Sequence, residues 1–236
     1  MRIAEARRTL AVACGLAVEA RIVRAPGVRA LACGGDVLAL ATALRRELEA
    51  GASGVMSFGM AGGLIDDIRP GTWLVGRLVV GPAASWPTDA AWQQAILARL
   101  PGARLADLAG RDAIVAERTA KRALQRSTGA AAVDTESHVA AALAAEAGVP
   151  FAAFRVIADP ASRSLPPATA GALRRNGTIA VGAVLVAVSR APWQVRQLAR
   201  TARDAQLALR ALSRGRRLLG ASLGHPNLGE LGVDVR

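Results

Sequence analysis

The sequence is poor in aromatic residues, which make up 3% of its 236 residues, and it contains no tyrosine. Proteins that bind single-stranded nucleic acids stack bases on aromatic side chains, so this composition argues against a nucleic-acid partner. The two cysteines, Cys14 and Cys33, lie in apolar runs and form no cluster with histidine. We therefore expect buried free thiols in a reducing compartment, and neither a disulfide nor a metal site.

Lysine is nearly absent. Lys121 is the single lysine among 30 lysine and arginine residues. With 18 acidic residues, the formal net charge is +12. Such a charge attracts anions, including phosphate, a membrane surface or nucleic acid. An arginine-rich source proteome would explain the same excess without any partner, and both explanations stay open.

The sequence also lacks an apolar run long enough to cross a membrane. The longest run, Thr178 to Val188, falls far short of the roughly 20 residues that a spanning helix requires. The residues after Met1 do not form the apolar core of a signal peptide. We expect a cytoplasmic protein, with peripheral contact to a membrane as an open alternative.

The length and the apolar content of 52% predict one large α/β domain with a sizeable core. We place this domain at residues 1–215 and expect a flexible tail at residues 216–236. Asp89 to Leu100 reads as a surface helix that carries Trp92. A last long helix, from Pro192 to about Arg214, alternates apolar residues with arginines. It either covers the sheet with a solvated cationic face or contacts anionic lipid.

Two acids with different surroundings stand out between Val133 and Pro160. Glu136 lies where a helix begins, and Asp159 ends the apolar strand expected over Phe151 to Ile157. Ligands of open α/β sheets bind beyond the carboxyl ends of strands. One fold can therefore bring both carboxyl groups to the same rim. Considered alone, Glu136 is a first-turn helix acid and Asp159 an Asp-Pro turn residue, with no further role.

This stretch resembles the purine nucleoside phosphorylase and methylthioadenosine nucleosidase superfamily. The residues that carry the resemblance are Val133, Glu136, Pro150, Phe151, Arg155, Ile157 and Asp159. The hopanoid-associated phosphorylase branch is more similar, through Asp134–Ser137, Arg155–Pro160 and Leu165–Pro167. Thr135 replaces a methionine and Ala158 a serine that are usual in the superfamily. The resemblance covers roughly residues 9–210.

The resemblance implies a single-domain, three-layer αβα fold with a central mixed, partly barrel-like sheet. It also implies cleavage of an N-glycosidic bond, with adenine released from adenosylhopane to give ribosyl- or phosphoribosylhopane. A homo-oligomer is expected. A methylthioadenosine or adenosylhomocysteine nucleosidase is the alternative enzyme. A non-catalytic nucleotide- or nucleic-acid-binding protein is the alternative of another class.

A glycine-rich turn follows the strand expected at Gly54 to Phe58 and reads Gly59-Met60-Ala61-Gly62-Gly63. Glycines without a side chain let the backbone come close to another group. A crowded turn is the simplest explanation. By resemblance, Gly59, Met60, Ala61 and Gly62 contact the ribose side of a substrate.

Cleavage of an N-glycosidic bond requires one group that favours the positive charge on the sugar and another that protonates the departing base. By resemblance, Glu136 binds the ribose hydroxyls and Asp159 faces the purine nitrogen. Apolar surroundings raise the pKa of a carboxyl group, as Asp159 needs to hold a proton. Arg155 should point to the opposite face of its strand and leave Asp159 unneutralised. By resemblance, Glu19 is the candidate for the acid that positions water.

Several further positions complete the predicted site. By resemblance, Thr135 and Ala158 adjoin the substrate, and Ile114 stands where relatives stack an aromatic residue on the base. We expect no cofactor, with inorganic phosphate as an optional co-substrate. Gly34-Gly35, before a helix, and Arg69 are the candidate phosphate contacts. The sequence does not decide between hydrolysis and phosphorolysis.

Overall fold

The computed structural model describes residues 9–166, 177–178 and 195–228. Within these ranges eight strands form one sheet. They are β1 (Thr9–Cys14), β2 (Val28–Ala32), β3 (Ala52–Gly63), β4 (Trp73–Val80), β5 (Ser85–Pro87), β6 (Arg104–Gly110), β7 (Ala132–Asp134) and β8 (Phe151–Asp159). Most of the apolar run from Thr178 to Val188, and Pro192, where the last helix was expected to begin, lie outside the described residues.

The sheet is mixed and partly closed on itself. Its main path runs β2-β1-β3-β7-β6-β4-β5, and β8 pairs with both β3 and β4. Strands β3, β7, β6, β4 and β8 therefore form a closed ring, whereas β2, β1 and β5 extend from it. The β3–β8 and β4–β6 pairs are parallel, and the β4–β8 and β3–β7 pairs are antiparallel. The predicted mixed, partly barrel-like sheet is confirmed.

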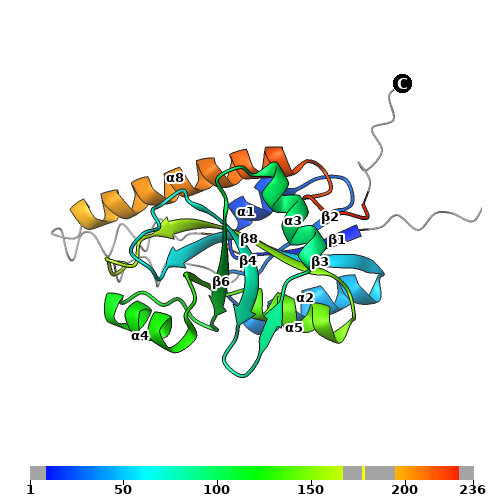
Figure 1. Cartoon of the computed structure of the whole chain (residues 1–236), viewed down its shortest axis with the longest axis horizontal. Helices are drawn as coiled ribbons and strands as arrows, with labels where there is room; N and C mark the ends of the chain where they lie inside the picture. Colours follow the sequence, from blue (N-terminus) through cyan, green and yellow to red (C-terminus); the bar gives the residue numbers. More distant parts are fainter. Residues whose placement is uncertain (1–8, 167–176, 179–194, 229–236) are drawn as a thin grey trace, which may run out of the picture.

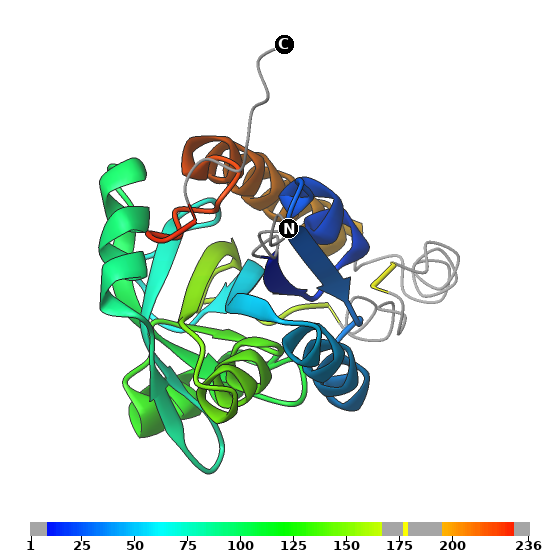
Figure 2. The same ribbon diagram turned by 90° about the vertical axis from the view of Figure 1, so that its right-hand side faces the viewer.

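Helices cover both faces of the sheet. They are α1 (Ala17–Val23), α2 (Val37–Glu49), α3 (Ala90–Arg99), α4 (Arg118–Thr128), α5 (Ser137–Glu146) and α8 (Val195–Leu219). Helices α2 and α5 contribute to one buried apolar cluster, and α1, α3 and α8 to a second. Figures 1 and 2 show these two groups on opposite sides of the strands. The three-layer arrangement is thus also confirmed.

Strand β1 shows why the strands read as continuous apolar runs. Leu10 and Val12 belong to the cluster beneath α1, α3 and α8, whereas Ala11 and Ala13 belong to the cluster beneath α2 and α5. Successive side chains point to opposite faces of a strand. A strand covered on both faces therefore needs apolar residues at every position.

Two expectations about the α3 and α8 region were wrong. Trp92 is fully buried rather than on the surface, and its indole N–H donates to the Leu223 carbonyl at 3.0 Å. The segment expected to begin a flexible tail instead continues α8 to Leu219 and packs beside α3. Leu219, Leu223 and Leu228 are buried there, because Trp92 and Ile96 present an apolar surface that they cover.

We predict that Leu219→Ala lowers the free energy of unfolding by about 2–5 kcal/mol, because it removes a fully buried side chain. The matched control is Leu218→Ala, one residue earlier in the same helix, whose side chain is 44% exposed. That change should stay within about 0.5 kcal/mol. Urea unfolding followed by circular dichroism measures both. Equal effects of the two variants would contradict the packed position of this segment.

Candidate active site

A pocket of about 180 Å³ lies where β1, β3 and β8 reach their carboxyl ends. These three strands are parallel, so their ends meet at one rim. The loop after β1, the first turn of α1, the residues just before α5 and residues 113–115 complete the wall. The lining residues are Gly15, Leu16, Glu19, Met60, Ala61, Gly62, Ala113, Ile114, Val115, Val133, Asp134, Thr135, Glu136, Ala158, Asp159 and Leu165.

Glu136 is held at the pocket by Arg155, which is fully buried. One Arg155 guanidinium nitrogen lies 3.1 Å from a Glu136 carboxylate oxygen and 3.0 Å from an oxygen of Asp134. The Thr135 hydroxyl also donates to Glu136 in a short hydrogen bond. Burial raises the pKa of Glu136, and the Arg155 charge opposes this shift. Arg155 is therefore engaged by Glu136 and Asp134, partners that the sequence did not predict.

Asp134 lines the pocket and also stabilises the start of α5. Its carboxylate accepts the backbone N–H groups of Glu136 and Ser137 at 2.9 and 2.7 Å. It also accepts the Ser137 hydroxyl at 2.7 Å. A side chain that accepts the free N–H groups at the start of a helix stabilises that start. Asp134 thus sets the direction of the chain from which Glu136 projects.

Glu19 reaches the same pocket from α1. Its two carboxylate oxygens accept the backbone N–H groups of Leu16 at 2.8 Å and Met60 at 2.7 Å. Burial, followed by the nearby charge of Glu136, raises the pKa of Glu19 to about 7. A carboxyl group with this pKa exchanges a proton near neutral pH, which suits a general acid or base.

Asp159 is paired with Lys121, the single lysine of the chain. Lys121 is fully buried, and its ammonium donates to Asp159 in a short contact. It also donates to the Pro160 and Arg163 carbonyls at 3.1 and 3.2 Å. Burial raises the pKa of Asp159, and the Lys121 charge opposes the rise. We expected apolar surroundings alone, so this cation corrects the predicted environment of Asp159.

Each of the three candidate acids is packed against a glycine. A methyl group added at Gly15 would lie 2.9 Å from a Glu136 oxygen, and one at Gly59 would lie 2.8 Å from the Glu19 carboxyl. One added at Gly62 would lie 3.3 Å from Asp159. Contacts under 3.0 Å are not tolerated without movement. The absence of side chains here therefore makes room for the carboxylates.

The structure brings most of the predicted site residues together and leaves four outside the pocket. Gly59 lies behind the wall, against Glu19. The Gly34 N–H donates to the Gly15 carbonyl at 3.1 Å, so Gly34-Gly35 flank the wall without lining it. Arg69 is exposed in a turn, where its N–H donates to Thr72. The residues that line the pocket as predicted are Glu19, Met60, Ala61, Gly62, Ile114, Thr135, Glu136, Ala158 and Asp159.

Sequence reasoning missed the two buried cations. Arg155 was expected on the opposite face of its strand, and Lys121 was noted only as the single lysine of the chain. One signal was available for Lys121, because it is the only lysine in a chain that otherwise uses arginine. For Arg155 the signal was a charged residue inside an otherwise apolar strand. A buried charge requires a counter-charge nearby, which can be sought among neighbouring acids.

The lining is mostly apolar, with acids at separate points of the wall. Glu136 beside Arg155 offers a carboxylate that can accept hydrogen bonds from sugar hydroxyls and favour positive charge. Asp159 beside Lys121 offers a group that can deliver a proton. Two carboxyl groups in different surroundings can divide the tasks of acid and charge stabilisation. Among the described residues no cluster of histidine, cysteine and acidic side chains suits a metal ion.

Solved structures with a similar fold include two nucleosidases and a futalosine hydrolase. The methylthioadenosine/S-adenosylhomocysteine nucleosidase of Helicobacter pylori is 14% identical, with a TM-score of 0.64 over 90% of this chain and 96% of that one. The futalosine hydrolase of the same organism is 18% identical, with a TM-score of 0.57 over 64% and 88%. The corresponding nucleosidase of Streptococcus pneumoniae, bound to 8-aminoadenine, is 14% identical, with a TM-score of 0.59 over 65% and 86%.

At these identities the structural likeness establishes the fold. A search of curated protein sequences finds no significant match. The sequence model of the phosphorylase superfamily matches residues 14–191, which span strands β2 to β8, the glycine turn and all three acids of the pocket. The chain therefore belongs to the phosphorylase superfamily.

Proposed function

We propose that this enzyme cleaves the N-glycosidic bond of an adenine nucleoside and releases adenine, and that its substrate is adenosylhopane. The observation that carries the proposal is the pair of differently supported acids in one apolar pocket. Glu136 is tied to Arg155, and Asp159 to Lys121. Membership of the phosphorylase superfamily favours an enzyme over a non-catalytic binding protein.

The proposed mechanism divides the work between these acids. Glu136, held by Arg155 and Thr135, accepts the ribose hydroxyls and stabilises the positive charge that develops on the sugar. Asp159 protonates the purine ring nitrogen as the bond to the sugar breaks, because adenine is otherwise a poor leaving group. In hydrolysis, ionised Glu19 accepts a proton from the attacking water.

The lipid substrate is supported by the motifs of the hopanoid-associated branch and by the character of the wall. Leu16, Met60, Ile114, Val115 and Leu165 surround the acids, and an apolar wall suits a lipid-linked nucleoside. A methylthioadenosine or adenosylhomocysteine nucleosidase fits the fold equally well, since one such enzyme is a structural neighbour. Adenine release from adenosylhopane or from methylthioadenosine separates these two activities.

The acceptor of the sugar is either water or phosphate, and a phosphate ion would be bound by cationic side chains at the pocket. No arginine or lysine belongs to the lining among the described residues. Arg155 and Lys121 lie behind the wall and are engaged by carboxylates. Phosphorolysis would yield phosphoribosylhopane and hydrolysis ribosylhopane, and a comparison with and without phosphate assigns the product.

We expect adenine release from adenosylhopane, and a loss of about 10²–10⁴-fold in kcat for Asp159→Asn, because the amide cannot deliver the proton. Adenine is measured by chromatography, with and without phosphate. The matched control is Asp67→Asn, an exposed acid paired with Arg104, which should keep wild-type activity. Release only from methylthioadenosine would support the alternative enzyme, and release from neither substrate would overturn the proposal.

If water is the acceptor, kcat should rise with pH through about 7, where Glu19 loses its proton. The ionised carboxylate is the form that can take a proton from water. Glu19→Gln should abolish this rise and lower kcat by about 10²–10⁴-fold. The measurement is a pH–rate profile at saturating substrate. The same rise in Glu19→Gln would assign the titration to another group.

Activity should fall at high pH when Asp159 loses the proton that it delivers to the base. Lys121→Met should move this fall to higher pH. Lys121 lowers the pKa of Asp159, so removal of its charge lets Asp159 keep its proton to higher pH. Methionine fills a similar volume without charge. The pH–rate profile tests this shift, and circular dichroism checks that the variant is folded. An unchanged alkaline limb in a folded variant would show that Lys121 does not set the protonation of Asp159.

A further inference from the structure

The outer face of α8 carries a continuous stripe of arginines. Its inner face packs on the sheet through Ala208, Leu212, Gly215 and Leu219, which are buried. The opposite positions recur every three or four residues up to Arg217, with Leu218 directly after it, and all are exposed. They are Arg196, Arg200, Arg203, Leu207, Arg210, Arg214, Arg217 and Leu218, and we call this set the arginine stripe. At 3.6 residues per turn these positions fall within about 100° of arc, along roughly 30 Å of helix.

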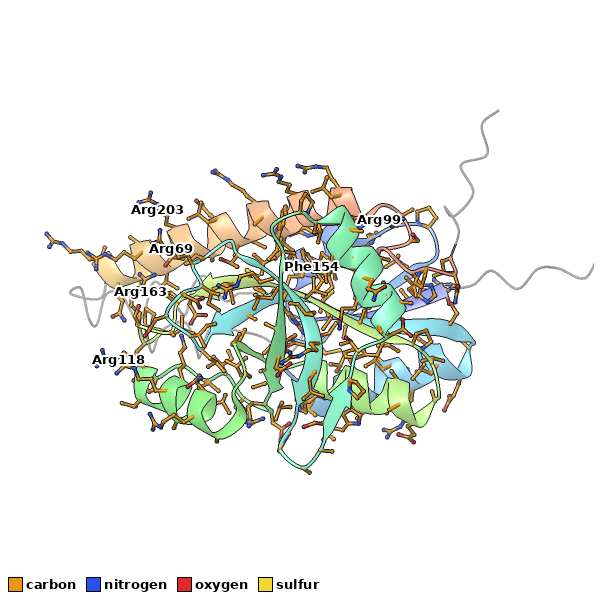
Figure 3. All side chains as sticks on the ribbon, in the orientation of Figure 1. Arg69, Arg99, Arg118, Phe154, Arg163 and Arg203 are labelled. Carbon is orange, nitrogen blue, oxygen red and sulfur yellow. The ribbon has the colours of Figure 1, made fainter. Side chains whose placement is uncertain are left out.

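The arginine stripe contains no compensating acid. The one acidic residue of α8, Asp204, turns inward and pairs with Arg163. Within the described part of the chain, none of the stripe arginines forms an ion pair with a carboxylate. Arg214 lies over the Trp73 ring at 5.5 Å and remains exposed. Figure 3 shows Arg203 on the outer side of α8, at the same end of the molecule as Arg163.

Apolar side chains lie among these charges. Leu207, between Arg203 and Arg210 along the stripe, is 42% exposed, and Leu218 is 44% exposed. An arginine-rich helix face with exposed leucines is the pattern of helices that lie in the plane of a lipid interface. Nucleic acid would complement the arginines but would leave these leucines in water. No helix among the described residues is long and apolar enough to cross a bilayer.

The stripe is linked to the pocket through one loop. Residues 161–166 follow Asp159, and Leu165 of this loop lines the pocket. Arg163 pairs with Asp204 of α8, and the Gln197 side chain of α8 donates to the Ser164 carbonyl at 3.1 Å. The N-terminal half of α8 is therefore fastened to a wall of the pocket. A surface that binds α8 would lie beside that wall.

We propose that the arginine stripe docks the enzyme on an anionic phospholipid bilayer, with Leu207 and Leu218 entering the interface. The reason for such docking rests on the proposed lipid-linked substrate. Its test does not, because vesicle binding is measured without any substrate. Docked in this way, the enzyme receives a nucleoside whose lipid portion stays in the membrane. Electrostatic attraction between arginines and anionic head groups supplies the binding, so added salt weakens it.

The test is sedimentation of the purified protein with vesicles of phosphatidylcholine alone or mixed with phosphatidylglycerol. We expect binding to the mixed vesicles only, with a fall as salt is raised. Arg203→Glu/Arg210→Glu should weaken it by more than about tenfold, since each arginine near the surface contributes about fivefold. The matched control is Arg46→Glu/Arg122→Glu, on exposed positions of α2 and α4. Each double variant lowers the net charge from +12 to +8.

Three results would overturn this proposal. An equal loss in both double variants would mean that net charge, not the stripe, drives binding. Equal binding to neutral vesicles would exclude charge recognition. Tighter binding to duplex DNA than to vesicles, unchanged by Leu207→Gln, would indicate a nucleic-acid partner. Sedimentation needs no turnover, so its outcome is independent of adenine release. Conversely, Arg203→Glu/Arg210→Glu should leave the activity on any soluble nucleoside substrate unchanged.

Discussion

The site depends on the neutralisation of one buried guanidinium. Arg155 projects from β8 into the interior, where it meets Glu136 and Asp134 near the start of α5. It also donates to the Ser57 hydroxyl and to the Met60 carbonyl, both on β3. A buried charge that lost its partners would destabilise the fold by about 3–5 kcal/mol. The need to neutralise Arg155 therefore fixes β3, β8 and α5 around Glu136.

Asp159 is supported in a different way, and the difference separates the two acids chemically. The guanidinium beside Glu136 does not give up its proton at any physiological pH, so Glu136 is held as an acceptor. The ammonium beside Asp159 is a compact point charge that donates to one carboxylate and two carbonyls. It lowers the pKa of a carboxyl group that burial raises. Arg155 and Lys121 thus give Glu136 and Asp159 different surroundings within one pocket, and these surroundings suit the two acids to different tasks.

Much of the fold was predictable, because strands buried on both faces leave long apolar runs, as in β1 and, apart from Arg155, in β8. The placement of the acids followed from the rule that ligands bind at the carboxyl ends of strands. The partners of Arg155 did not follow, because its pairing with Asp134 depends on sheet register and strand bulges. Trp92 was misjudged for the same reason. The residues that cover it, near Leu223, are more than a hundred positions away and carry no local signal.

The glycines of the pocket show how such a site limits its own sequence. Gly15, Gly59 and Gly62 each face one of the three acids, at distances that leave no room for a methyl group at the first two. We expected the glycine turn to let the backbone approach a substrate. Met60, Ala61 and Gly62 do line the pocket, and the geometry of the turn also lets buried carboxylates approach the backbone, as Glu19 does at Met60. A larger residue at Gly15 or Gly59 would displace an acid before it touched any ligand, so these positions constrain the chemistry through the protein's own side chains.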